Sequence, residues 1–138
     1  MRGMICYMTG AVLYVLTGLL HGLAHFAPGP TDERLIAAQQ AMSDAVQTMA
    51  GMSFSYADAM HCLSWYMTLF SLLTGLLAIA LRKACRADAR LRRVVSTLLA
   101  IGAAVLAAVA YCHGIFPPFL LYAIAALLCA AAAVRARA

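Results

Sequence analysis

Long apolar runs separated by shorter polar segments dominate the pattern of this chain. Four runs are readable, at about residues 4–26, 59–81, 94–116 and 118–134. A helix needs roughly 20 apolar residues to cross the hydrocarbon core of a bilayer, with a range of about 17–25. The first three runs reach this length easily, and the short fourth run gains Pro117 and Pro118 in its first turn, where proline is tolerated. The pattern therefore predicts four transmembrane helices in a single domain spanning 1–138.

Small and polar residues recur at steps of three and four within the first two runs, so each set lies on one helical face. Such residues mark helix–helix contacts in lipid, where close backbone approach and interhelical hydrogen bonds drive packing. We therefore expect an all-α, up-down-up-down bundle of four helices. The two faces consist of Tyr7, Gly10, Tyr14, Thr17 or Gly18, His21 and His25, and of Asp58, His61, Ser64 or Trp65, Thr68, Ser71 or Leu72, and Gly75.

The polar segment 27–58 lies between the first and second runs. Pro30 with Thr31 or Asp32 is a typical helix start, and Gly51 a typical stop. Between them, Leu35, Met42, Val46 and Met49 share one face, which Met52 continues. An amphipathic helix over about 31–50 is therefore expected to lie along the membrane surface and to cover the end of the bundle.

Composition supports a membrane protein. The chain is 65% hydrophobic and 11% charged, whereas a soluble domain is about 45–50% apolar and about 25% charged. Its net charge of +5 comes from basic residues gathered at the ends of the apolar runs. That distribution is typical of membrane orientation rather than of nucleic-acid binding.

The basic residues also predict an orientation. Arg2, the six Lys and Arg residues of 82–93, Arg135 and Arg137 fall on one side, and only Arg34 on the other. By the positive-inside rule, both termini and the 82–93 loop are cytoplasmic, and 27–58 is outside. The expected location is a bacterial inner membrane. The 82–93 loop could also bind anionic lipid headgroups, although its role in orientation already accounts for its charge. A cleaved signal peptide is the competing interpretation of the first run; it is disfavoured because the run is longer than the usual apolar core of about 7–15 residues and 25–27 is a poor cleavage site.

All four histidines lie at the outer ends of these runs. His21 and His25 are one helical turn apart, which is the spacing by which a helix chelates a transition metal. His61 and His113 could complete a metal site, and Asp58 could orient His61 or act as a ligand. Thioether and thiol sulfur atoms on the same side favour copper or zinc as the metal. The residues that supply them are Met42, Met49, Met52, Met60, Cys62 and Cys112. Haem held between His21 and His61 is a second option.

Two other interpretations stay open. Histidines at a membrane boundary can simply keep one end in water, and the protein would then be a structural or accessory subunit that packs against partner helices or further copies of itself. An enzyme is disfavoured, since the sequence shows no Ser-His-Asp set, no carboxylate pair facing the bundle and no glycine-rich phosphate loop. A membrane oxidoreductase using the same histidines is the least favoured interpretation.

Residues 10–80 resemble a loose group of small four-helix bacterial membrane proteins of uncharacterised function. The resemblance lies in the Gly/His-rich end of the first run, Gly18 to His25, and in the aromatic second run from Trp65 to Gly75. It implies the four-helix fold and carries no activity.

Overall fold

The computed structural model describes residues 2–136; Arg137, one of the basic residues expected in the cytoplasm, lies outside this range. In chain order the elements are α1 (Arg2–Ala24), α2 (Glu33–Asp44), β1 (Val46–Met49), β2 (Met52–Ser55), α3 (Tyr56–Ala80), α4 (Arg82–Ala87), α5 (Ala89–Cys112) and α6 (Phe116–Arg135). Four of them, α1, α3, α5 and α6, are long and apolar enough to cross a membrane. The prediction of four long apolar helices is therefore confirmed.

The distribution of side-chain sizes is the reverse of that in a soluble bundle. Large aliphatic side chains face outward, and Leu73, Leu98 and Leu127 are 65%, 65% and 73% exposed. The interior is built mainly from alanine, tyrosine and small polar residues. Exposed leucine is favourable in hydrocarbon, while small interior residues allow helices to approach closely. The four long helices thus form a membrane-embedded bundle.

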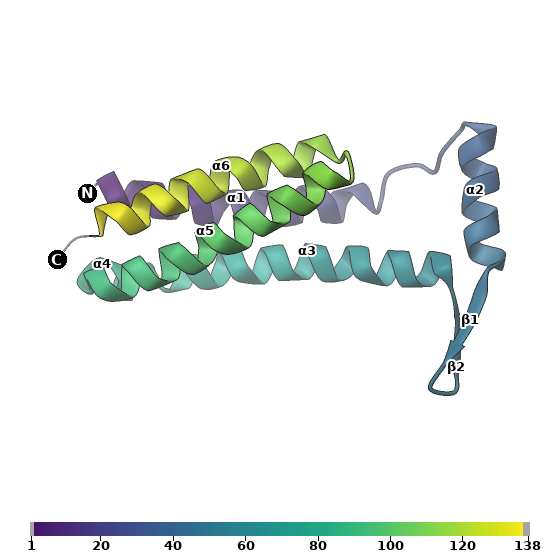
Figure 1. Ribbon diagram of the computed structural model, residues 1–138, viewed down its shortest axis with the longest axis horizontal. Coiled ribbons are helices and arrows are strands. Elements are labelled where there is room, and N and C mark those ends of the chain that lie inside the picture. Colours follow the sequence, from purple (N-terminus) through teal and green to yellow (C-terminus); the bar gives the residue numbers. More distant parts are fainter. Residues whose placement is uncertain (1, 137–138) are drawn as a thin grey trace.

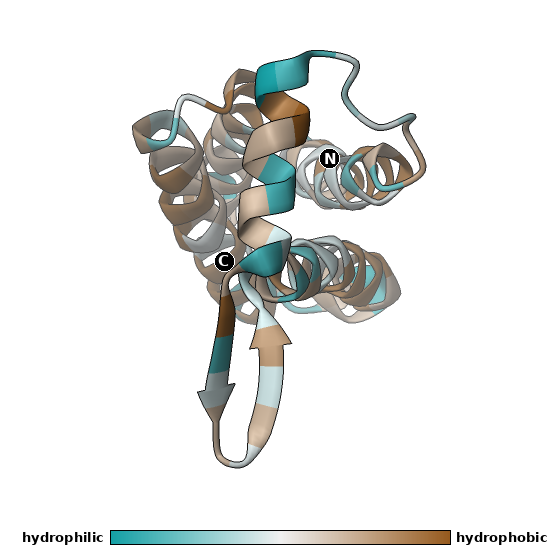
Figure 2. Cartoon of the chain, turned by 90° about the vertical axis from the view of Figure 1, so that its right-hand side faces the viewer, coloured by the Kyte–Doolittle hydropathy of each residue, from teal (hydrophilic) through white to brown (hydrophobic). Residues whose placement is uncertain are grey.

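The long helices lie side by side, with both termini at one end of the bundle and α2 and the β1–β2 hairpin at the other (Figure 1). Helix α1 packs against α3 and α6, and α5 packs against α6. Seen from the end, α2 crosses the mouth of the bundle and the hairpin projects beyond it (Figure 2). We call the end that carries α2 the histidine end, because all four histidines are near it.

Two glycines set the close approach of α1 and α3. A Cβ atom at Gly75 would lie 2.6 Å from Val15 Cγ2 and 2.8 Å from the backbone oxygen of Ala11. On the opposite helix, a Cβ atom at Gly18 would lie 2.9 Å from the backbone nitrogen of Leu72. Each glycine therefore makes room for the backbone of the other helix, which is the packing expected of small residues in lipid.

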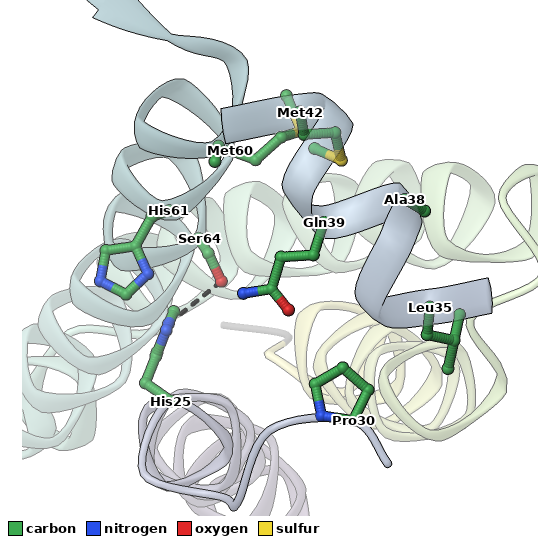
Figure 3. A pocket seen from close by; sticks show the side chains of 10 residues that line it. His25, Pro30, Leu35, Ala38, Gln39, Met42, Met60, His61 and Ser64 are labelled. Atoms are coloured by element: carbon green, nitrogen blue, oxygen red, sulfur yellow. Dashed lines mark hydrogen bonds between the residues drawn. The ribbon is translucent and has the colours of Figure 1, made fainter. Parts of the chain in front are cut away.

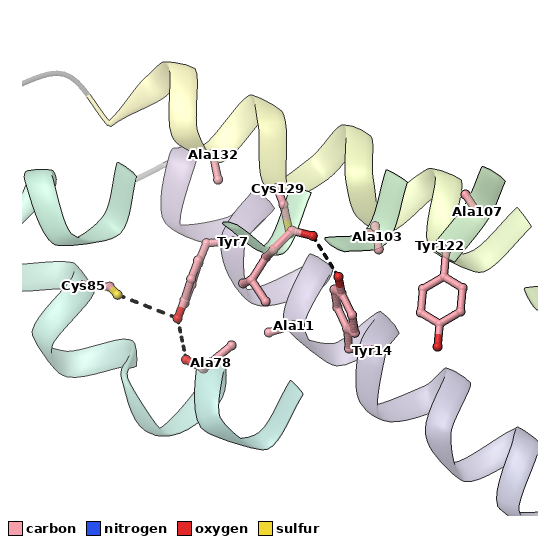
Figure 4. Close-up of a cluster of buried hydrophobic side chains, with 12 residues drawn as sticks. Tyr7, Ala11, Tyr14, Ala78, Cys85, Ala103, Ala107, Tyr122, Cys129 and Ala132 are labelled. Atoms are coloured by element: carbon pink, nitrogen blue, oxygen red, sulfur yellow. Dashed lines mark hydrogen bonds between the residues drawn. The ribbon is translucent and has the colours of Figure 1, made fainter. Parts of the chain in front are cut away.

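Buried tyrosines link the helices by hydrogen bonds (Figure 4). The Tyr7 hydroxyl donates to the carbonyl of Ala78 in α3 at 2.6 Å, and the Tyr14 hydroxyl donates to the carbonyl of Leu99 in α5 at 2.8 Å. A third pair, Ser71 and Tyr122, joins α3 to α6. Because lipid offers no alternative partners, buried hydroxyls must be satisfied within the bundle.

The prediction of one helix over 31–50 is wrong beyond Asp44. Asp32 caps α2 as predicted, its carboxylate accepting from the backbone N–H groups of Arg34 and Leu35. The helix ends at Asp44, however, and an antiparallel hairpin follows, with Val46 opposite Ser55 and Met49 opposite Met52. Ala50 and Gly51 have φ values of 50° and 80°, which is the backbone of a tight hairpin turn. Apolar spacing alone did not separate these two structures.

Three helix boundaries also differ from the predicted runs. Helix α1 ends at Ala24, so His25 lies in the turn that follows it. Helix α3 begins at Tyr56, because Ser55 and Asp58 form a capping box there. Helix α5 begins at Ala89, because Asp88 caps it, and the basic loop folds largely into α4 and the first turns of α5.

Substitution of Gly75 by alanine tests the α1–α3 contact. We expect the free energy of unfolding to fall by about 1–3 kcal/mol, because the added methyl group meets the facing backbone as well as the Val15 side chain. Unfolding in mixed detergent micelles measures this. Gly29→Ala is the matched control, since a Cβ atom there meets nothing within 4 Å. Equal stability of the two variants would show that the helices do not approach this closely.

Candidate functional site

The last turn of α1 and the first turns of α3 bring three of the four histidines together. The capping box at Ser55 and Asp58 fixes where α3 starts, and places His61 and Ser64 on the side that faces α1. His21 comes from the opposing end of α1, and His25 from the turn that follows it. The ring centres of His21 and His25 are 5.6 Å apart, and those of His25 and His61 are 5.0 Å apart.

Ser64 is the centre of this group. Its Oγ atom lies 2.8 Å from Nε2 of His21 and 3.0 Å from Nε2 of His25. One imidazole nitrogen from α1 and one from the turn after it thus converge on one oxygen of α3. We call the arrangement of His21, Ser64 and His25 the serine bridge.

Trp65 contacts two of the three rings, those of His61 and His25. Its indole N–H donates to Nε2 of His61 at 2.9 Å. Its ring stacks on His25, with centres 4.5 Å apart and planes 8° from parallel. His61 therefore already uses Nε2 as an acceptor, and His25 is fixed in its orientation from one face.

An open cleft lies over the serine bridge, beneath α2 (Figure 3). The amide of Gln39 projects from α2 towards the His25–Ser64 pair in this view, and the His61 ring stands beside it. Thioether side chains of Met42 and Met60 also line the cleft. Helix α2 therefore contributes side chains to the same cleft as His25 and His61.

A second cavity, of about 280 Å³, lies deeper between the four long helices. His21 and His113 both line it, as do Thr17 and Tyr122, and the rest of its wall is largely apolar. Ser64 lines both this inner cavity and the outer cleft. The serine bridge is therefore part of the partition between the two spaces.

The predicted ligand set is only partly brought together. His113 is the C-cap residue of α5 and lines the inner cavity, not the cleft that holds His25 and His61. The Asp58 carboxylate accepts hydrogen bonds from the backbone N–H and the hydroxyl of Ser55, so it is used in the helix cap. Within residues 2–136, no three His, Cys, Asp or Glu side chains form a group that could hold a metal ion.

The sulfur-containing residues predicted as ligands lie in different parts of the structure. Met42 and Met60 line the cleft, whereas Met49 and Met52 stand in the hairpin and are 64% and 69% exposed. Cys62 and Cys112 are free thiols on the exposed surface. Of the predicted sulfur donors, the two cleft methionines are therefore the ones placed beside the histidines.

Ser64 and Trp65 are site residues that the sequence reasoning did not select. Both belong to the polar face of the second run, three and four residues after His61, so a signal was present. Their position on that face predicts a role in helix packing only. A hydroxyl and an indole N–H are the usual partners of imidazole nitrogens, and their position one turn from a histidine could have identified them.

Comparison with known proteins identified no relative. No family model, no curated protein and no solved structure matches this chain.

Replacement of Ser64 by alanine tests the serine bridge. Two hydrogen bonds between α1 and α3 are lost, so we expect the free energy of unfolding to fall by about 1–3 kcal/mol. Unfolding in mixed micelles is again the measurement. Ser43→Ala is the control, because that hydroxyl makes an exposed hydrogen bond within α2. A Ser64→Ala variant as stable as this control would mean that neither histidine depends on the serine.

Proposed function

We propose that this membrane protein binds a transition-metal ion at its histidine end, with His21 and His25 as the imidazole ligands. The observation that carries the proposal is the convergence of their Nε2 atoms on Ser64 Oγ, at 2.8 and 3.0 Å. Imidazole binds zinc at about 2.0–2.1 Å. An ion that replaces the hydroxyl would draw each nitrogen inward by roughly 1 Å or less.

His61 is the proposed third ligand. Two imidazoles on one tetrahedral ion, with bonds of about 2 Å, have ring centres roughly 5 Å apart. The two neighbouring separations here are 5.6 and 5.0 Å, close to this value, although the three side chains do not form a metal-binding group without rearrangement. The orientation of His61 does not suit a shared ion, because its Nε2 atom accepts from Trp65. Binding would therefore require the His61 ring to exchange the indole for the ion.

Copper(I) is the metal that the cleft supports best. Met42 and Met60 bring thioether sulfur to the same cleft as His25 and His61. Thioether with imidazole selects copper(I), whereas zinc prefers thiolate, imidazole and carboxylate. Haem has less support, because the inner cavity beside His21 measures about 280 Å³, below the usual range of about 300–1,000 Å³ for organic ligands.

Metal titration of the purified protein tests the proposal. Trp65 is the single tryptophan of the chain, and it stacks on His25, so its fluorescence reports on the site. We expect copper(I) to change this fluorescence and to bind at one ion per chain. His25→Ala should weaken binding by at least about tenfold to a hundredfold, which is the loss seen when only a hydrogen-bond partner of a metal ligand is removed. Met60→Leu should weaken copper(I) without a matching effect on zinc.

His113→Ala is the matched control, since His113 lines only the inner cavity and should leave copper affinity unchanged. If the folded wild-type protein binds neither copper nor zinc, the metal proposal fails. The accessory-subunit interpretation would then be favoured. A groove of about 610 Å³ between α5 and α6, lined mostly by alanine, is the observation that supports it, because small residues let a partner helix or a second copy approach closely.

We further propose that the histidine end faces outward and both termini face the cytoplasm of a bacterium. The basic residues of α4 and α5 support this orientation. In a background without the native cysteines, Ser53→Cys in the hairpin should react with a membrane-impermeant maleimide added to intact cells. Arg90→Cys should react only after the cells are broken. The opposite labelling pattern would reverse the orientation.

A further inference from the structure

Arginines converge at the end of the bundle opposite to the histidines. A cavity of about 330 Å³ is lined there by Arg82 and Arg86 of α4, Arg92 of α5 and Arg135 of α6. The remaining lining comes from the first turn of α1, at Gly3, Met4 and Ile5. Four guanidinium groups from three helices therefore share one small space. We call it the arginine pocket.

Acidic residues do not balance this charge. Of the five acidic residues in the chain, four lie between positions 32 and 58, at the other end, and Asp88 is the fifth. The Asp88 carboxylate accepts from the backbone N–H groups of Arg90 and Leu91 and so caps α5. The positive charge of the pocket is thus left for a ligand to neutralise.

At least one N–H donor of these guanidinium groups has no hydrogen-bond partner. Arg92 Nε is buried and has no hydrogen-bond partner, while its Nη1 donates to the carbonyl of Cys85 at 3.1 Å. Arg135 Nη1 is 3.2 Å from the sulfur of Cys6, which is a weak acceptor. A buried guanidinium donor without a partner is costly. An anion in the pocket would give the guanidinium groups that line it charge-assisted hydrogen-bond partners.

The first turn of α1 adds a second attraction for an anion. Its first backbone N–H groups have no partners within the helix, and they carry the positive end of the helix dipole. No acidic residue stands in this turn. Gly3 also allows α6 to come close, since a Cβ atom there would lie 3.2 Å from Arg135 Cβ. Helix N-termini bind phosphate groups by these same means.

We propose that the arginine pocket binds a phosphate group. Arginine presents paired donors that match phosphate oxygens. The pocket lies at the ends of the membrane-spanning helices, which is the depth of the lipid headgroups. Ile5 borders it and is 64% exposed, so an acyl chain can follow the apolar surface away from the phosphate. A phosphate of an anionic phospholipid is therefore the expected source, and free phosphate is the other.

Lipid titration of the delipidated protein, followed by native mass spectrometry, tests this proposal. We expect phosphatidylglycerol to bind about tenfold or more tightly than zwitterionic phosphatidylcholine, because the pocket carries uncompensated positive charge. The double variant Arg82→Gln with Arg86→Gln should lose about tenfold or more of that affinity. Arg86→Gln alone, at an exposed position, is the second variant in case the double variant does not fold.

The control is Lys83→Gln with Arg90→Gln. It removes the same charge from the same region, but neither residue lines the pocket. If both double variants lose affinity equally, the attraction is spread over the surface and the pocket is not a site. If neither loses affinity, the proposal also fails. Inorganic phosphate that binds the wild type but not the pocket variant, with no preference among lipids, would support the pocket and assign it to free phosphate.

Discussion

The close contact of α1 and α3 is the constraint on which the rest of the structure depends. In hydrocarbon, helices gain nothing by hiding leucine from their surroundings, so association relies on packing and on internal hydrogen bonds. Gly18 and Gly75 each admit the backbone of the facing helix. This contact lets Ser64 of α3 meet His21 at the end of α1 and His25 just after it. The candidate metal site therefore depends on two glycines without a functional group.

The chemistry of the protein is found at the two ends of the bundle because its middle is filled by small residues. Alanines such as Ala11, Ala103 and Ala125 are completely buried there, and the hydroxyls of Tyr7 and Tyr14 form interhelical hydrogen bonds. Longer polar side chains are found at the ends. Imidazoles and thioethers gather at one end, and guanidinium groups at the other. The two ends therefore suit ligands of opposite charge.

The helices could be predicted from the sequence more fully than the site. Apolar runs of membrane length identified all four long helices, because lipid imposes that length on any spanning segment. The hairpin after Asp44 was missed, because Val46 and Met49 fit a helical face as well as a strand, and the turn is made by Ala50 and Gly51 rather than by a typical Asn-Gly pair. Local spacing could not decide between the two.

The site was predicted in its residue types but not in its connections. The spacing of His21 and His25, together with the end position of His61, was enough to place three rings near one another. The role of Ser64 depends on how α1 and α3 are rotated about their axes. The sequence pattern allows either Ser64 or Trp65 on the packing face, so it does not fix this rotation. The same uncertainty explains His113, which lies at the expected depth but lines the inner cavity.

The serine bridge also has a consequence for where the hydrogens of the site lie. A hydroxyl has one hydrogen to give, so Ser64 cannot donate to both His21 and His25. At least one of these two rings must carry its own hydrogen on Nε2 in the observed arrangement. A metal ion, in contrast, needs both Nε2 atoms bare. The two states of the site therefore differ in tautomer as well as in occupancy, so taking up an ion requires a hydrogen to move to Nδ1 or to leave the protein.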